Sequence, residues 1–103
     1  MIEISSSEQI SNKYKTNPNF LLREIGGEYV LIPVGEAGIL NNSVISLNET
    51  SQFLWEMFMT PSTLEDVIVK AKEAYSAPEG IIEQEVKSFA EAYLEVGLLL
   101  KEE

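Results

Sequence analysis

The sequence predicts a single α+β domain in which three strands precede three helices. Two β-rich runs, at residues 20–25 and 28–33, flank a Gly-Gly pair, and a third run, at residues 43–47, leads directly into a helical pattern. Two further segments carry apolar residues at helical spacing. A chain of 103 residues is long enough for one domain with one modest core.

The Gly-Gly pair at 26–27 predicts a tight hairpin between the first two strands. Glycine accepts the positive φ angles that two-residue hairpin turns require. Pairing through this turn sets Leu22 opposite Leu31, and it leaves apolar groups on both faces of the ribbon. We therefore expect helices to cover one face of the sheet. The other face should be partly covered or should expose apolar groups that can contact a partner.

The first helix is predicted to begin after Asn48. Asparagine is a preferred N-cap residue, and Glu49 would lie at the positive end of the helix dipole. Leu54 and Phe58 share a face at a spacing of four residues, which should pack on the sheet. Trp55 lies beside this stripe and is also expected in the core.

Two capping-box patterns, STLE at residues 62–65 and SAPE at residues 76–79, predict the starts of the second and third helices. The third helix should end at Gly97, a natural left-handed stop. Five of its residues share one arc of the helical wheel and are expected in the core: Ile82, Val86, Phe89, Tyr93 and Val96. The apolar residues 98–100 should then place the C-terminal end against the sheet.

The N-terminal segment is polar and shows no sustained period. We assign residues 1–17 to a flexible arm and residues 18–103 to the folded domain. The start of the chain lacks the basic and apolar stretches of a secretory signal, and no apolar run reaches the roughly 18 residues that cross a bilayer. A cytoplasmic protein without membrane association is the resulting expectation.

The composition excludes most catalytic classes and disfavours nucleic-acid binding. There are no cysteines and no histidines, so thiolate chemistry, imidazole metal sites and the commonest general base are absent. The net charge is −10, and the seven Lys and Arg residues are scattered, which disfavours binding to a phosphate backbone. We expect no enzyme activity, no catalytic residues, no metal and no cofactor, since no nucleophile has an evident base.

A set of short motifs follows the predicted hairpin in a fixed order. They are LNET at residues 47–50 with Leu54-Trp55, TLED at 63–66, EVKSF at 85–89 and GLL at 97–99. On these motifs, from about residue 20 to 100, the chain resembles the PqqD family of small peptide-binding proteins. One connection departs from the family pattern: MTPS at residues 59–62 stands where members commonly have an Asp-Gly turn.

The resemblance implies a winged-helix-like fold, with a three-stranded antiparallel sheet followed by three helices. It also implies a peptide chaperone of natural product biosynthesis, a recognition element for ribosomally made, post-translationally modified peptides. Such proteins bind the leader of a precursor peptide and present it to a maturase, often a radical SAM enzyme. Whether this chain would serve quinone cofactor synthesis or another pathway is left open.

The binding mode implied by the resemblance is strand addition, in which an extended peptide pairs with the third strand and its side chains enter a groove beside the third helix. The implied strand residues are Ser43, Val44, Ile45, Ser46 and Leu47. The implied groove wall consists of Lys87, Ala90, Glu91 and Leu94. The alternative is that Ile45 and Leu47 are core residues, while Val44 and Ser46 only face solvent at a sheet edge.

Two other functions remain open at this point. A winged-helix regulator that binds nucleic acid would share the fold, although the negative charge counts against it. A docking subunit could use the same edge and groove for a protein without any leader peptide. Homodimer formation through exposed strand edges is left open as well.

Overall fold

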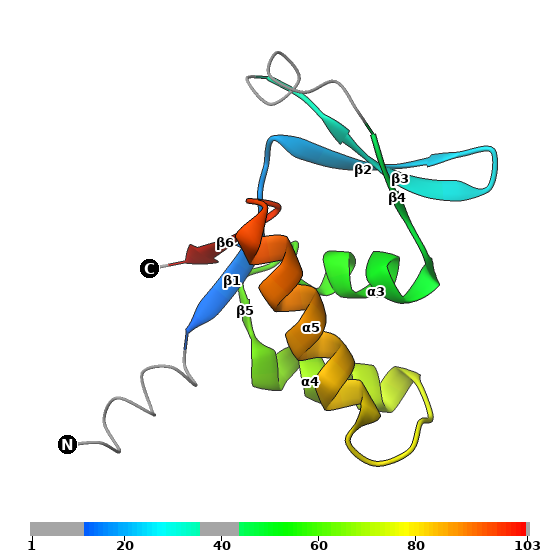
Figure 1. The fold of residues 1–103 in the computed structure, drawn as a ribbon, viewed down its shortest axis with the longest axis vertical. Coiled ribbons are helices and arrows are strands. Elements are labelled where there is room, and N and C mark those ends of the chain that lie inside the picture. The colour runs from blue at the N-terminus through cyan, green and yellow to red at the C-terminus, as the bar shows by residue number, and fades with distance from the viewer. Residues whose placement is uncertain (1–11, 36–43, 103) are drawn as a thin grey trace.

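The computed structural model describes residues 12–35 and 44–102. Within these residues the chain forms two three-stranded antiparallel sheets and three helices, which confirms the predicted α+β class (Figure 1). The elements in chain order are β1 (Lys13–Thr16), β2 (Phe20–Ile25), β3 (Glu28–Pro33), β4 (Ile45–Leu47), α3 (Glu49–Met57), β5 (Ser62–Thr63), α4 (Leu64–Ala74), α5 (Ile81–Glu95) and β6 (Leu99–Glu102).

The first sheet has the strand order β2-β3-β4, and its hairpin has the predicted register, with Leu22 opposite Leu31. Gly26 and Gly27 have φ angles of 60° and 86°, so both central residues of the turn are left-handed, as a type I′ turn requires. An added Cβ would meet no atom within 4 Å at either glycine, so backbone conformation is the reason for glycine here.

The core lies between this sheet and the helices. Leu31 and Leu47 are buried on the inner face of the sheet, and α3 packs beneath them with Leu54, Trp55 and Phe58, all buried as predicted. Helix α3 also contacts α4 and α5, so it is the central element between the sheet and the other two helices (Figure 1). Burial of these large apolar side chains is the main stabilising term of the fold.

Helix α3 begins at the predicted cap. The Asn48 side-chain oxygen accepts a hydrogen bond of 2.8 Å from the Ser51 N–H, and Glu49 lies in the first turn. This bond satisfies one of the helix donors that lack an intrahelical acceptor.

Replacing Asn48 with alanine is therefore expected to lower the free energy of unfolding by about 1 kcal/mol. Urea denaturation followed by circular dichroism measures this change. An Asn48→Asp variant retains the acceptor oxygen and is the matched control, expected to stay close to the parent protein. Equal losses in both variants would contradict a capping role.

The second sheet, with the order β5-β1-β6, differs from the expected arrangement. Residues 13–16 of the predicted arm form its central strand. This strand pairs with β6 in a register that runs from Thr16↔Leu99 to Lys13↔Glu102. The Thr16 N–H also donates to the Phe58 carbonyl oxygen at 3.0 Å. The rest of the predicted arm, residues 1–11, lies outside the described part of the chain.

Both predicted capping boxes were placed wrongly. Helix α4 is capped by Thr63, whose hydroxyl oxygen accepts from the Asp66 N–H at 3.0 Å, one residue later than the STLE box implies. Ser62 instead donates its hydroxyl proton to the Thr60 carbonyl at 2.8 Å. Helix α5 begins at Ile81, after Gly80, and has no side-chain cap, because the SAPE segment crosses from α4 to α5 as a loop.

The end of α5 agrees with the prediction. Gly97 has a φ of 82°, and the Leu98 N–H donates to the Tyr93 carbonyl at 2.8 Å, closing the helix. Val96 was expected in the core but is 67% exposed, because the helix has already ended at Glu95. The remaining residues of the predicted arc are buried or partly buried against the core.

Candidate functional site

Strand β4 is the edge strand of the first sheet. It pairs with β3 through Leu31↔Ile45 and Tyr29↔Leu47, and no described residue pairs with its other side. An edge strand presents unpaired backbone donors and acceptors, which makes it a place where another chain can add.

The hydrogen-bond pattern of the sheet shows which β4 residue faces outward. Just beyond the ladder, the Val34 N–H donates to the Asn19 carbonyl at 2.8 Å, so the backbone N–H and C=O of Val34 point toward the β2 side. In an antiparallel ladder the backbone hydrogen-bonding groups of successive residues point to opposite sides of the strand. The N–H and C=O of Val30 therefore also point toward β2, and those of Leu31 point toward β4. Ser46 lies opposite Val30, and its N–H and C=O therefore point away from β3, toward the open edge.

The side chains of the predicted strand divide between the two faces of the sheet. Leu47 is buried and Ile45 is partly buried on the core side, whereas Val44 and Ser46 are exposed. The core interpretation thus holds for the side chains of Ile45 and Leu47, while the backbone of Ser46 remains open at the edge. Ser43 lies outside the described residues.

The four predicted wall residues do not share one open surface on α5. Ala90 is only 2% exposed and Leu94 is partly buried against the core, whereas Lys87 and Glu91 are exposed. Ala90 therefore packs inside the domain, and its methyl group is not available to line a groove.

A cleft of about 250 Å³ opens where β4 ends, between the start of α3 and a different face of α5. Asn48 directly follows β4 and lines this cleft. Helix α5 contributes Glu85, Ser88 and Tyr93 to it. These α5 residues were not predicted as site residues, because periodicity identifies the buried stripe of a helix and not which flank of that stripe lies beside a particular strand.

Tyr93 connects the two walls of this cleft. Partial burial raises the pKa of the Tyr93 phenol above its usual value of 10.0, and a hydrogen bond with the Ser51 side chain acts in the opposite direction. The Tyr93 ring also stacks on Phe89, with the ring centroids 3.9 Å apart. The phenol is thus neutral at physiological pH and is held between α3 and α5.

A broader depression of about 890 Å³ lies on the hairpin side of Asn48 and includes Ser46 among its lining residues. The carboxylates that line this depression and the cleft are Glu28, Glu49 and Glu85, and neither hollow is lined by a lysine or arginine. The surface around the end of β4 is therefore acidic.

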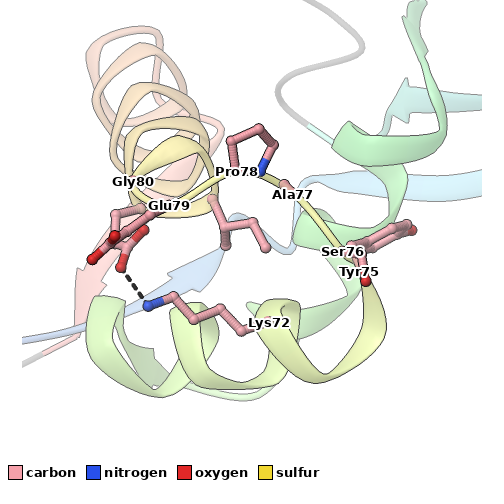
Figure 2. Close-up of a pocket in the computed structure, with 9 residues that line it drawn as sticks. Lys72, Tyr75, Ser76, Ala77, Pro78, Glu79 and Gly80 are labelled. Atoms are coloured by element: carbon pink, nitrogen blue, oxygen red, sulfur yellow. Dashed lines mark ion pairs between the residues drawn. The ribbon is translucent and has the colours of Figure 1, made fainter.

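The loop between α4 and α5 covers a third hollow, shown in Figure 2. Below it, Lys72 of α4 forms an ion pair with Oε2 of Glu83 on α5. The hydrogen bond from Lys72 is the main cause that lowers the pKa of the Glu83 carboxyl below its usual value of 4.5. This pair joins α4 to α5 near the loop between them, at the end of the molecule distant from the β2-β3-β4 sheet (Figure 1).

A lowered carboxyl pKa makes the stability depend on pH. Because the pKa of Glu83 is lower in the folded protein than in the unfolded chain, its contribution is present above pH 4.5 and is lost as the pH falls through the folded value. Lys72→Met is expected to lower the melting temperature at pH 7, and the difference from the parent should shrink as the pH is lowered below 4.5. Thermal melts across this range measure the effect. Lys70→Met is the control, since Lys70 has no ion pair with a described residue.

In the part of the chain that the structure describes, no group of three or more acidic, histidine or cysteine residues is placed to hold a metal ion. No helix in that part is both long and apolar enough to cross a membrane.

Fold and site together define a small α+β domain whose distinctive surface is an open strand edge beside an acidic cleft. The family model described as "Coenzyme PQQ synthesis protein D (PqqD)" matches residues 28–99, and the chain belongs to this family. This confirms the family predicted from the motifs.

Among solved structures, the chain is similar to one described as "TbiB1 in Complex with the TbiA(beta) Leader Peptide". The TM-score is 0.65 at 18% sequence identity, and the match covers 82% of this chain and 93% of that chain. A likeness at this identity establishes the shared fold. Comparison with the curated proteins gives no match.

Proposed function

We propose that this protein is a non-enzymatic adaptor that binds the leader segment of a ribosomally made precursor peptide by strand addition at β4. The observation that carries the proposal is the outward-facing backbone of Ser46 at an edge with no partner among the described residues. Main-chain hydrogen bonds to such an edge supply affinity, and neighbouring side chains supply selectivity. Membership of the PqqD family and the leader peptide in the TbiB1 complex support this choice of ligand.

The proposed partners are the precursor peptide and the enzyme that modifies it, with a radical SAM maturase as one class. The adaptor would act in the cytoplasm, because a ribosomally made precursor is released there. Of the predicted contact residues, Val44 and Ser46 are kept as edge contacts, whereas Lys87 and Glu91 are not kept, because the cleft beside β4 opens on a different face of α5. Glu85, Ser88 and Tyr93 are added, because they line the cleft at the end of β4.

The test uses a displayed library of random 20-residue peptides as the probe, selected against the purified protein. Hydrogen exchange of the bound and free protein, read by NMR, then reports on single amides. We expect enriched peptides to slow exchange at the Ser46 amide, which faces the open edge in the free protein. The Glu24 amide at the opposite edge, on β2, should be unaffected.

Three outcomes would overturn the proposal. They are the absence of any enriched peptide, peptide binding without protection at Ser46, and protection at Ser46 that rises with protein concentration alone, which would assign the edge to a second copy of the chain. Filter binding to duplex DNA at low salt tests the nucleic-acid alternative, for which we expect no retention because of the acidic surface.

A further inference from the structure

A fourth, more apolar cavity of about 360 Å³ adjoins the cleft at the end of β4. The two hollows share Thr50, Leu54 and Glu85, so they form one path that runs along α3 and α5. The path ends beneath the loop that joins α4 to α5, on which Ser76 and Ala77 line the cavity. It therefore connects the end of the open strand edge to an apolar site on the helical side of the domain.

The cavity is lined mainly by apolar side chains, and several of the large ones are not fully buried. Phe53 and Tyr75 meet edge to face, with their ring centroids 5.1 Å apart. Tyr75 is 39% exposed and Ile81 is 43% exposed, and both line the cavity, while Val86 is buried. Exposed apolar groups gathered around a concavity are typical of a site that receives an apolar group.

The charges around the cavity indicate which kind of residue would stand next to the apolar group in the ligand. Glu85 lies on the boundary between the cavity and the cleft, and it is the one carboxylate that lines either of them. The nearby cation Lys72 forms its ion pair with Glu83 and lines the neighbouring hollow under the loop instead (Figure 2). With a net charge of −10 on the whole chain, the path favours a basic ligand.

We infer that this cavity is a second specificity site for the bound peptide. It would take an apolar side chain from the segment that leaves the β4 edge at Leu47, and a neighbouring lysine or arginine of the peptide would pair with Glu85. The inference rests on the proposed function, since the strand edge must hold the same peptide. It adds a sequence requirement outside the paired strand.

The test compares two bulky substitutions in the exposed loop. Ala77→Trp places an indole at a residue that lines the cavity, whereas Pro78→Trp changes a neighbour that lines only the hollow of Figure 2. The probe is the random 20-residue peptide library, followed by titration of the most enriched peptide. We expect Ala77→Trp to weaken binding roughly 10- to 100-fold, as for loss of one buried apolar side chain, and Pro78→Trp to change it by less than about threefold.

A charge reversal tests the second part of the inference. Peptides selected by the parent protein should carry an apolar residue and a basic residue at a fixed distance from the paired segment. Selection by a Glu85→Lys variant should replace the basic residue with an acidic one at the same place. Glu85 is exposed, and circular dichroism verifies that each variant is folded.

The outcomes separate this inference from the proposed function. Enriched peptides that need the Ser46 edge but show no preference outside the paired segment would overturn the cavity site alone. Equal binding by the Ala77→Trp and Pro78→Trp variants would do the same. Failure to enrich any peptide would overturn the strand-addition proposal and this inference with it.

Discussion

Replacing Ser46 with proline is expected to reduce binding of an added peptide strand roughly 100-fold, while the domain stays folded. Proline removes the N–H that faces the open edge, and its ring occupies the space where the added strand would lie. The peptide acceptor would then be left without its partner in the interface, which costs more than one hydrogen bond contributes. The β3–β4 ladder is spared, because Leu31↔Ile45 and Tyr29↔Leu47 are its hydrogen-bonded pairs.

The matched control is Glu24→Pro. Glu24 lies opposite Tyr29, so its N–H also points away from β3, but on the far edge of the same sheet. Both residues are exposed, so neither substitution removes a core side chain. Calorimetric titration with an enriched peptide should show a large loss for Ser46→Pro and none for Glu24→Pro. Equal affinities in the two folded variants would show that the peptide does not add at β4.

Local chemistry was sufficient to predict the elements that depend on a few neighbouring residues. The Gly-Gly turn determined the hairpin register, since two left-handed residues permit one way of closing the ribbon. Asn48 marked the start of α3 and Gly97 the end of α5 for similar reasons. The core stripe of α3 followed from its periodicity, and Trp55, which lies beside this stripe, is buried as expected.

Features that depend on distant parts of the chain were not predicted. Strand β1 forms because β6 and β5 lie on either side of it, more than forty residues away in sequence, and nothing within residues 13–16 indicates this pairing. The set of α5 residues that line the cleft at the end of β4 is a second feature that was not predicted. The Lys72–Glu83 pair shows that the Glu83 side of α5 faces α4, and the Glu85 side faces the start of α3. Such rotation about a helix axis is set by packing against neighbouring elements.

Phe58→Ala is expected to cause the largest loss of stability of any change considered, about 3–5 kcal/mol. Phe58 is 0% exposed, and its ring stacks on Phe89 with the centroids 6.1 Å apart and the planes within 7°. Its carbonyl oxygen also accepts the Thr16 N–H, so the residue joins α3, α5 and the second sheet. Truncation would leave a cavity at this junction, and a small domain has only about 5–15 kcal/mol of stability in total.

Met59→Ala is the control for this change, because Met59 is the next residue but is 58% exposed. It should alter the free energy of unfolding by less than about 0.5 kcal/mol. Thermal melts should show a decrease of roughly 10–40 °C for Phe58→Ala and little change for Met59→Ala. Peptide binding by Phe58→Ala, measured below its melting temperature, should remain near that of the parent, because Phe58 lies in the core and the proposed contacts lie at β4 and α5. A loss of binding without a loss of stability would instead place Phe58 in the binding site and contradict its role as a packing residue.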